Sequence, residues 1–119
     1  MITFVCYPKC TTCQKARKWL DENQIAYEFR DIKTDNPSFD ELTAWHLSSG
    51  LPPRKFFNTS GLLYKSMDLK NRLPAMSEEE MLKLLATDGM LVKRPLAIGD
   101  GVVLVGFKEA EWESRLKTE

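Results

Sequence analysis

The stretch that decides the fold is Ile2-Thr3-Phe4-Val5-Cys6-Tyr7-Pro8-Lys9-Cys10-Thr11-Thr12-Cys13. Its first five residues are typical of a short, largely buried strand, and the pattern turns helical at about Thr12. The N-terminus of a helix has unpaired N–H groups and a partial positive charge, which stabilise a nearby thiolate. The pattern therefore predicts thiol chemistry, with the outer Cys10 as the nucleophile. Cys13, one helical turn further on, is expected to resolve a mixed disulfide.

Length and composition limit the possible functions. A chain of 119 residues forms one compact domain and leaves little for a second. The 17 basic and 17 acidic residues give a formal net charge of zero, which argues against sequence-independent electrostatic binding of nucleic acid. No apolar run is long enough to cross a bilayer, and Met1 leads straight into the first strand without a signal peptide, so a cytoplasmic protein is expected. Thiols stay reduced there, so three cysteines indicate catalysis or metal binding and not a disulfide scaffold.

Helical and strand patterns alternate in the first third of the chain. A helix is expected over 12–23, because Cys13, Ala16 and Leu20 fall on one face. Alternating apolar residues over 25–30 then predict a second strand.

The middle of the chain is predicted to be helical. Two capping boxes, Ser38-x-x-Glu41 and Ser77-x-x-Glu80, each open a helix. Gly50 is expected to end the first of these helices, and Asp88-Gly89 the second. Between them we expect a short helix after Pro52-Pro53, a turn over 58–61 and a helix over 62–71.

The C-terminal third predicts a hairpin and a last helix. Asp100-Gly101 separates the apolar runs 96–98 and 102–105, although Gly99 can lengthen the loop, and 108–116 has an amphipathic pattern. A mixed four-stranded sheet covered by helices accommodates this order as one α/β domain over 1–119. The two N-terminal strands are expected to be parallel, and the helices of about 38–90 to form an insertion between strands 2 and 3.

Two metal sites are considered and set aside. Cys6-x-x-x-Cys10-x-x-Cys13 has the spacing of some iron–sulfur enzymes, but Cys6 ends a strand and Cys13 lies inside a helix, so their sulfurs are expected to diverge. Cys6 is interpreted as a buried, small apolar residue. Zinc would need the three cysteines together with the single histidine, His46, which is interpreted as an ordinary helix-surface residue. No metal site is therefore predicted.

The sequence lacks the residues that several other enzyme classes require. A single histidine with no thiol or hydroxyl motif placed near it does not suggest a Cys-His or Ser-His-Asp hydrolase, and no glycine-rich phosphate loop is present.

Arg94-Pro95 is the second informative pair. The proline can simply start a strand, or it can follow a cis bond in a tight turn. Such a turn beside the C-x-x-C loop would present backbone groups to a substrate disulfide. Arg94 would then add positive charge near Cys10 and attract an anion. Arg54, in the middle helices, is a second candidate for that role, although most arginines only solvate a surface.

Three segments together resemble the ArsC/Spx family: Tyr7-Pro8-Lys9-Cys10-Thr11-Thr12-Cys13, Lys93-Arg94-Pro95-Leu96 and Val105-Gly106-Phe107-Lys108-Glu109. This family comprises glutaredoxin-linked arsenate reductases, the redox-sensing regulator Spx and uncharacterised relatives. The resemblance covers essentially the whole chain. It implies a thioredoxin/glutaredoxin-like fold with a helical insertion and a cis peptide bond before Pro95.

Resemblance to the arsenate reductases implies a role for several residues. Cys10 would attack arsenate, while backbone amides at the helix start, around Thr11 and Thr12, hold the oxyanion. Arg94 would be one of three arginines that bind the same oxyanion, beside the loop of Pro95.

The other two arginines of the reductases do not carry over. Their positions fall at Asn58 and Gly106, with Arg54 one helical turn before Asn58. Each lost charge-assisted contact is worth roughly 1.5–3 kcal/mol, which should weaken arsenate binding severely. The monothiol reductases also have serine in place of Cys13 and rely on glutathione, whereas Cys13 would allow an internal disulfide.

Resemblance to Spx implies a different class, a transcription regulator that binds the RNA polymerase α subunit and uses Cys10 and Cys13 as a switch. Gly50 would match a glycine of that contact surface. Spx chains continue past the last helix in a basic tail, whereas this chain stops at Lys117-Thr118-Glu119. The unbroken segment 56–61 is more similar to the uncharacterised, enzyme-like branch of the family.

The sequence thus favours a monomeric thiol oxidoreductase resembling the arsenate reductases, with no bound cofactor. Its expected substrate is a small oxyanion or a disulfide, and its external reductant is glutathione with glutaredoxin, or thioredoxin. Neither nucleic acid nor a membrane is expected to bind it directly.

Overall fold

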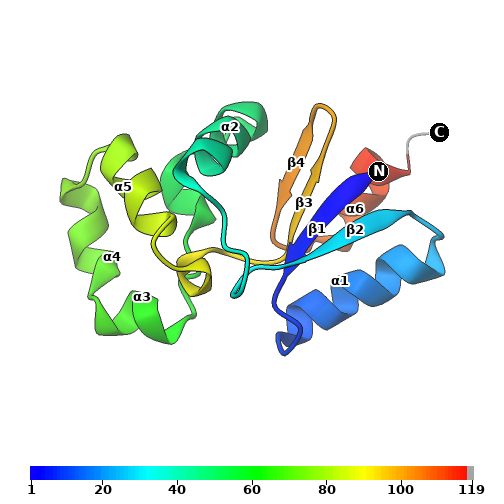
Figure 1. Cartoon of the computed structure of the whole chain (residues 1–119), viewed down its shortest axis with the longest axis horizontal. Coiled ribbons are helices and arrows are strands. Elements are labelled where there is room, and N and C mark those ends of the chain that lie inside the picture. The colour runs from blue at the N-terminus through cyan, green and yellow to red at the C-terminus, as the bar shows by residue number, and fades with distance from the viewer. Residues whose placement is uncertain (118–119) are drawn as a thin grey trace. The chain divides into compact units, whose positions relative to one another are not determined.

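The computed structural model describes residues 1–117 and divides into two compact units (Figure 1). The first unit consists of Met1–Asp31 and the described residues from Arg94 onwards, and the second of Ile32–Lys93. The helices predicted for about 38–90 lie in the second unit. Among the described residues, none of the helices combines the length and the apolar character that a bilayer crossing requires.

A mixed four-stranded sheet of order β2-β1-β3-β4 forms the first unit. β1 (Ile2–Cys6) is parallel to β2 (Tyr27–Asp31) and antiparallel to β3 (Leu96–Gly99). β3 pairs in turn with the antiparallel β4 (Val102–Val105). The connection between the two parallel strands is α1 (Thr11–Glu22). These features confirm the predicted α/β class and the predicted strand directions.

The end of α1 explains why β2 begins later than predicted. Gln24 has a left-handed backbone with φ of 55°, and the N–H of Ile25 donates to the carbonyl of Leu20 at 3.0 Å. Ile25 therefore closes the helix instead of opening the strand, which starts at Tyr27.

The predicted hairpin is present with a two-residue loop. Gly99 pairs with Val102, so it belongs to the strand and does not lengthen the loop. Gly101 supplies a φ of +69°, a conformation in which glycine carries no steric penalty.

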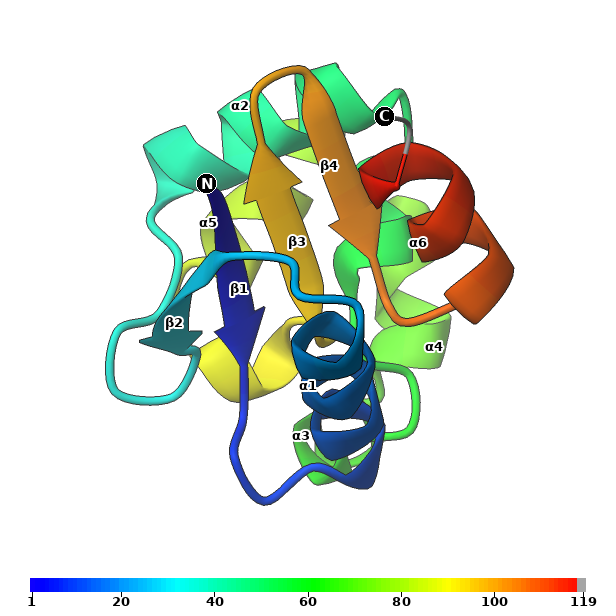
Figure 2. The ribbon, with the colours of Figure 1, turned by 90° about the vertical axis from the view of Figure 1, so that its right-hand side faces the viewer.

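Two helices, α1 and α6 (Glu109–Leu116), pack on the same face of the sheet (Figure 2). Trp112 of α6 is fully buried there, with edge-on ring contacts to Phe4 of β1 and Trp19 of α1. Its indole N–H donates to the carbonyl of Gly106 at 3.0 Å. The last helix is thereby fixed to the end of β4 through a buried hydrogen bond.

The second unit is built from short helices. They are α2 (Phe39–Ser49), η1 (Pro53–Phe56), α3 (Leu62–Ser66), α4 (Leu69–Arg72), η2 (Leu73–Ala75), α5 (Glu78–Leu85) and η3 (Gly89–Leu91). Both predicted capping boxes form, and Gly50 ends α2 with φ of +72°. The buried side chains of this unit come mainly from α2, η1, α4 and α5.

Two boundaries in the second unit differ from prediction. The helix expected over 62–71 is split into α3 and α4, because Asp68 adopts a left-handed φ of 53° between them. α5 ends at Leu85 and not at Asp88. Asp88 instead starts η3, where its carboxylate accepts the N–H of Met90 at 2.8 Å.

The capping box of α5 leads to a pH-dependent prediction. The carboxylate of Glu80 accepts the backbone N–H of Ser77 at 2.8 Å, and this bond, followed by the Ser77 side chain, lowers the pKa of Glu80 below its ordinary value of 4.5. Because the folded pKa is depressed, the stabilisation is present above the ordinary pKa and is lost as the pH falls through the folded value. We therefore expect Glu80→Ala to lower the free energy of unfolding at neutral pH and to have less effect at about pH 3, measured by urea unfolding.

Glu79→Ala is the matched control for this measurement. Glu79 is a neighbour in the same first turn, and its carboxylate contacts Lys83 at 3.3 Å between two exposed side chains, a pair that contributes little. A Glu80→Ala effect that is equal at both pH values would contradict the role of the carboxylate.

The Trp112 hydrogen bond leads to a second prediction. Trp112→Phe keeps an aromatic ring but leaves the buried carbonyl of Gly106 without the indole donor. We expect a loss of about 1–3 kcal/mol in the free energy of unfolding from this carbonyl, in addition to the loss of ring volume. Trp19→Phe, in the same aromatic cluster, is the control for ring volume. Equal losses in the two variants would show that the hydrogen bond contributes nothing.

Candidate active site

Cys10 is the N-cap residue of α1. Its backbone is extended, with φ of −83° and ψ of 124°, and its side chain makes no capping hydrogen bond. Its N–H donates to the carbonyl of Tyr7 at 2.9 Å, and its own carbonyl accepts the N–H of Gln14 at 3.0 Å. The half-buried thiol therefore sits at the positive end of the helix, where the exposed residues Thr11 and Thr12 form the first turn.

Cys13 lies behind Cys10, with a side chain that is only 1% exposed. Its sulfur accepts the backbone N–H of Tyr7 at 3.3 Å, and its side chain lies with Cys6 in the core cluster against which Cys10 packs. A hydrogen bond with Cys6 and, second, burial raise the pKa of Cys13 well above the ordinary range of a thiol. Cys13 therefore holds its proton at neutral pH, and Cys10 is the more accessible of the two thiols.

The expectation that the sulfurs of Cys6 and Cys13 diverge is wrong. Cys6 ends β1 with its side chain in the core cluster below α1, and the first turn of α1 brings Cys13 into the same cluster. A hydrogen bond between the two thiols is the first cause of the lowered pKa of Cys6 and of the raised pKa of Cys13. Cys6 is buried, as predicted, at 2% exposure. In residues 1–117 no group of three or more histidine, cysteine or acidic side chains has an arrangement that could hold a metal ion.

Arg94 and Pro95 are joined by a cis peptide bond, as the family resemblance implied. The guanidinium carbon of Arg94 lies 5.5 Å from the centroid of the Tyr7 ring, within the range of a cation–π contact. Since Tyr7 also accepts the N–H of Cys10, it connects the arginine to the cysteine loop. The positive charge of Arg94 is thus held beside the loop that carries Cys10. This role of Tyr7 was not predicted from the sequence, although Tyr7 stands three residues before Cys10 in the C-x-x-C segment.

Gly106 stands where the resemblance to the arsenate reductases implies an arginine in those enzymes. It is buried, its φ is +78°, and its N–H donates to the carbonyl of Pro95 at 2.8 Å. An arginine would pay a steric penalty in this left-handed backbone, so the local conformation accounts for the glycine.

Arg54 and Asn58, the remaining predicted binding residues, belong to the second unit. Arg54 is exposed on η1, and Asn58 follows this helix with its N–H bonded to the carbonyl of Leu91 at 2.8 Å. Their role in substrate binding stays a prediction.

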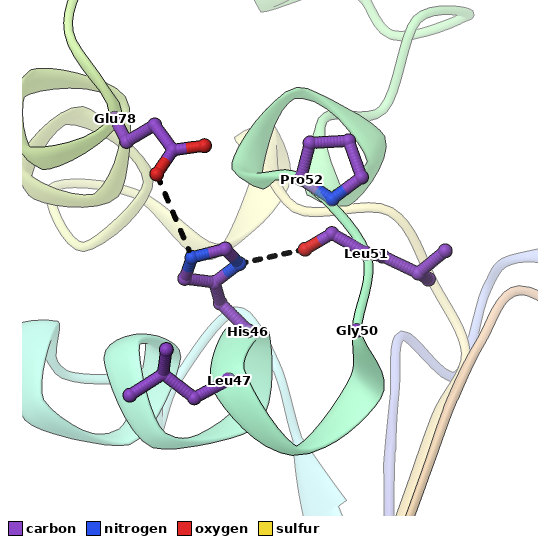
Figure 3. Close-up of a pocket in the computed structure, with 6 residues that line it drawn as sticks. All are labelled: His46, Leu47, Gly50, Leu51, Pro52 and Glu78. Atoms are coloured by element: carbon purple, nitrogen blue, oxygen red, sulfur yellow. Dashed lines mark hydrogen bonds and ion pairs between the residues drawn. The ribbon is translucent and has the colours of Figure 1, made fainter.

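His46 lines a cavity of about 320 Å³ in the second unit (Figure 3). Its Nδ1 donates to the carbonyl of Leu51 at 2.6 Å, because a carbonyl oxygen can only accept. Its Nε2 faces the carboxylate of Glu78 at 3.9 Å. These contacts connect α2 to the following loop and to α5, and they give His46 a structural role.

The family model described as "ArsC family" matches residues 6–115. This chain belongs to the ArsC family. The match includes all the predicted site residues, from Cys10 to Pro95.

Two relatives show the kinds of protein that this ArsC-family chain is similar to. The uncharacterized protein YusI of Bacillus subtilis is 51% identical over 112 residues, which are 94% of this chain and 95% of YusI. The global transcriptional regulator Spx of Enterococcus faecalis is 28% identical over 111 residues, which are 93% of this chain and 83% of Spx.

Solved structures confirm the fold. An ArsC family related protein from Bacteroides fragilis has 57% sequence identity and a TM-score of 0.92, covering 95% of this chain and 97% of its own. A protein from Streptococcus mutans described as "a possible arsenate reductase" has 43% identity and a TM-score of 0.84, covering 91% of this chain and 92% of its own. The thioredoxin-like ArsC fold implied by the sequence motifs is therefore correct.

The site geometry predicts an order of thiol reactivity. Iodoacetamide at neutral pH should modify Cys10 first, because Cys13 is buried and holds its proton. Mass spectrometry of the tryptic peptide 10–15, with fragmentation to separate its two cysteines, measures the order. Cys10→Ser should remove the rapid phase. Modification of Cys13 at the rate of Cys10 in the folded protein would contradict the geometry.

Proposed function

We propose that this ArsC-family chain is a thiol-dependent oxidoreductase in which Cys10 attacks an oxidised substrate, either a disulfide or an oxyanion. The observation that carries this proposal is the arrangement of two thiols at the start of α1: Cys10 is half-buried, and it packs against the core cluster that contains the buried Cys13. One thiol is open to substrate and the other is shielded. That is the division of roles that attack and resolution require.

A disulfide substrate would be reduced in two steps. The Cys10 thiolate forms a bond to one substrate sulfur, and the other sulfur leaves and takes up a proton. Cys13 then attacks the sulfur of Cys10, releases the second substrate thiol and gives up its own proton. The substrate gains two electrons, and Cys10 and Cys13 become a disulfide. Glutathione with glutaredoxin, or thioredoxin, would restore the two thiols from outside.

Arsenate is the oxyanion that we propose to test, since the Streptococcus mutans neighbour is described as a possible arsenate reductase. Cys10 would displace water from arsenic, and a second thiol, Cys13 or glutathione, would attack the sulfur of Cys10 and leave two electrons on arsenic. Arg94 and the backbone amides at Thr11 and Thr12 would hold the anion. The proposed reaction takes place in the cytoplasm, where these reductants keep thiols reduced.

A coupled assay tests the proposed reaction. NADPH oxidation is followed with arsenate or a model disulfide, once with glutathione and glutaredoxin and once with thioredoxin and its reductase. Cys10→Ser should abolish turnover with either substrate. Cys13→Ser should abolish the thioredoxin-linked reaction and keep a glutathione-linked one. Absence of turnover in every arm, while iodoacetamide still modifies Cys10, would contradict the enzyme proposal.

The role of Arg94 is tested in the same assay. Arg94→Met removes one charge-assisted contact to an anionic substrate, worth about 1.5–3 kcal/mol, so kcat/KM should fall by about 10- to 150-fold. Arg115→Met, at an exposed position of α6, is the matched control and should change kcat/KM little. Equal effects of the two substitutions would contradict a role of Arg94 in substrate binding.

A redox-switched regulator is the second candidate, because the match to Spx covers 93% of this chain and 83% of Spx. Under this proposal the disulfide between Cys10 and Cys13 changes binding to RNA polymerase. Titration of the reduced and the oxidised protein against the C-terminal domain of the polymerase α subunit tests it. Binding in one redox state would support the regulator, and absence of binding in both would contradict it.

A further inference from the structure

We propose that Cys6 is a third redox-active thiol of this site. In this proposal Cys6 attacks the disulfide between Cys10 and Cys13, moves it to the Cys6–Cys13 pair and returns Cys10 as a thiolate. The inference rests on the proposed function, because that reaction supplies the first disulfide.

The arrangement of the three thiols supports this transfer. Cys6 and Cys13 are buried in the same core cluster and Cys10 packs against it, so Cys13 is the thiol that lies between the accessible cysteine and the buried one. The backbone N–H of Tyr7, the residue that follows Cys6, is 3.3 Å from the sulfur of Cys13. In thiol–disulfide exchange the central sulfur must be within reach of both the entering and the leaving sulfur. Cys13 meets that condition.

The transfer balances without any external reagent. The Cys6 sulfur forms a bond to the Cys13 sulfur while the bond from Cys13 to Cys10 breaks, and the electron pair of that bond goes to Cys10. The proton lost by Cys6 passes to solvent or to Cys10. No net oxidation occurs, because one disulfide replaces another. The leaving thiolate forms at the N-terminus of α1, where the helix dipole favours a negative charge.

Burial makes Cys6 an internal partner and not a second nucleophile for substrate. Cys6 is 2% exposed, so a dissolved disulfide cannot reach it directly, whereas Cys13 lies in the same core cluster. After the transfer, Cys10 is again available but no longer has a free resolving thiol. The chain would then act as a monothiol and depend on glutathione, so the Cys6–Cys13 disulfide would change the reductant that the enzyme uses.

Counting released thiolate tests the proposal. With excess 5,5′-dithiobis(2-nitrobenzoate), Cys10 releases one nitrothiobenzoate when it attacks, and resolution by Cys13 releases a second. Transfer to Cys6 frees Cys10 for another attack. The reduced native protein should therefore release about three equivalents per chain, Cys6→Ser about two and Cys13→Ser about one.

Peptide mapping of the same wild-type reaction, quenched with acid, locates the disulfide without any substitution. Trypsin cleaves after Lys9 and Lys15, so Cys6 is on peptide 1–9, whereas Cys10 and Cys13 share peptide 10–15. The proposal expects peptides 1–9 and 10–15 to be linked through Cys13, with the nitrothiobenzoate adduct on Cys10.

The remaining outcomes separate this inference from the proposed function. A third equivalent bound to Cys6, or two equivalents with Cys6 unmodified, would overturn the transfer and leave the Cys10–Cys13 chemistry intact. A single equivalent, with a stable adduct on Cys10 and no disulfide, would overturn the transfer and also resolution by Cys13. Because the mapping uses the wild-type chain, a folding defect in Cys6→Ser would not prevent the decision.

Discussion

The site depends on how the chain turns from β1 into α1. Only four residues separate the strand from the helix, and the turn is closed by the hydrogen bond from the N–H of Cys10 to the carbonyl of Tyr7. The N–H of Tyr7 points the other way, to the sulfur of Cys13. Tyr7 therefore fixes both cysteines through its backbone: Cys10 at the outer end of the helix and Cys13 inside the core. A longer or looser turn would lose this division between an accessible and a shielded thiol.

The core of the first unit holds the other part of the site, Arg94 and Pro95, in place. The carbonyl of Pro95 accepts the N–H of Gly106, and the carbonyl of Gly106 accepts the indole N–H of Trp112. This chain of two hydrogen bonds connects a fully buried tryptophan to the residue next to Arg94. The guanidinium of Arg94 then contacts the ring of Tyr7. These contacts thus link the packing of α6 to the position of the Arg94 charge.

Local signals in the sequence predicted most of the fold. Both capping boxes, the glycine that ends α2, the hairpin around Asp100-Gly101 and the directions of the strands rest on short-range chemistry that a sequence displays. Two of the three boundary errors fall where the backbone takes a left-handed conformation at a residue other than glycine, and the third, the end of α5 at Leu85, does not. Gln24 delays β2, and Asp68 divides the helix expected over 62–71. Nothing in the identity of these residues requires a positive φ.

The candidate site was predictable only where its residues stand in recognisable sequence motifs. Cys10, Cys13 and Arg94-Pro95 stand in recognisable motifs, whereas the contact of Cys6 with Cys13 depends on the angle at which α1 crosses the end of β1. Seven positions separate these cysteines, and neither strand nor helix periodicity relates them. The same limitation applies to Tyr7, whose ring contact with Arg94 joins segments far apart in the chain.

The buried thiol pair also bears on how an enzyme and a regulator could share this fold. In the proposed reaction the elevated pKa of Cys13 would slow its attack on an adduct at Cys10, because the thiolate is the nucleophile, and such an adduct would last longer. A prolonged adduct gives external glutathione time to compete, which suits a reductase linked to glutathione. The same burial shields a disulfide once it has formed, which suits a sensor that must remain oxidised long enough to act. The surroundings of the Cys13 thiol therefore influence which of these two functions the fold favours. Among those surroundings, the hydrogen bond with Cys6 is the first cause of the raised pKa of Cys13.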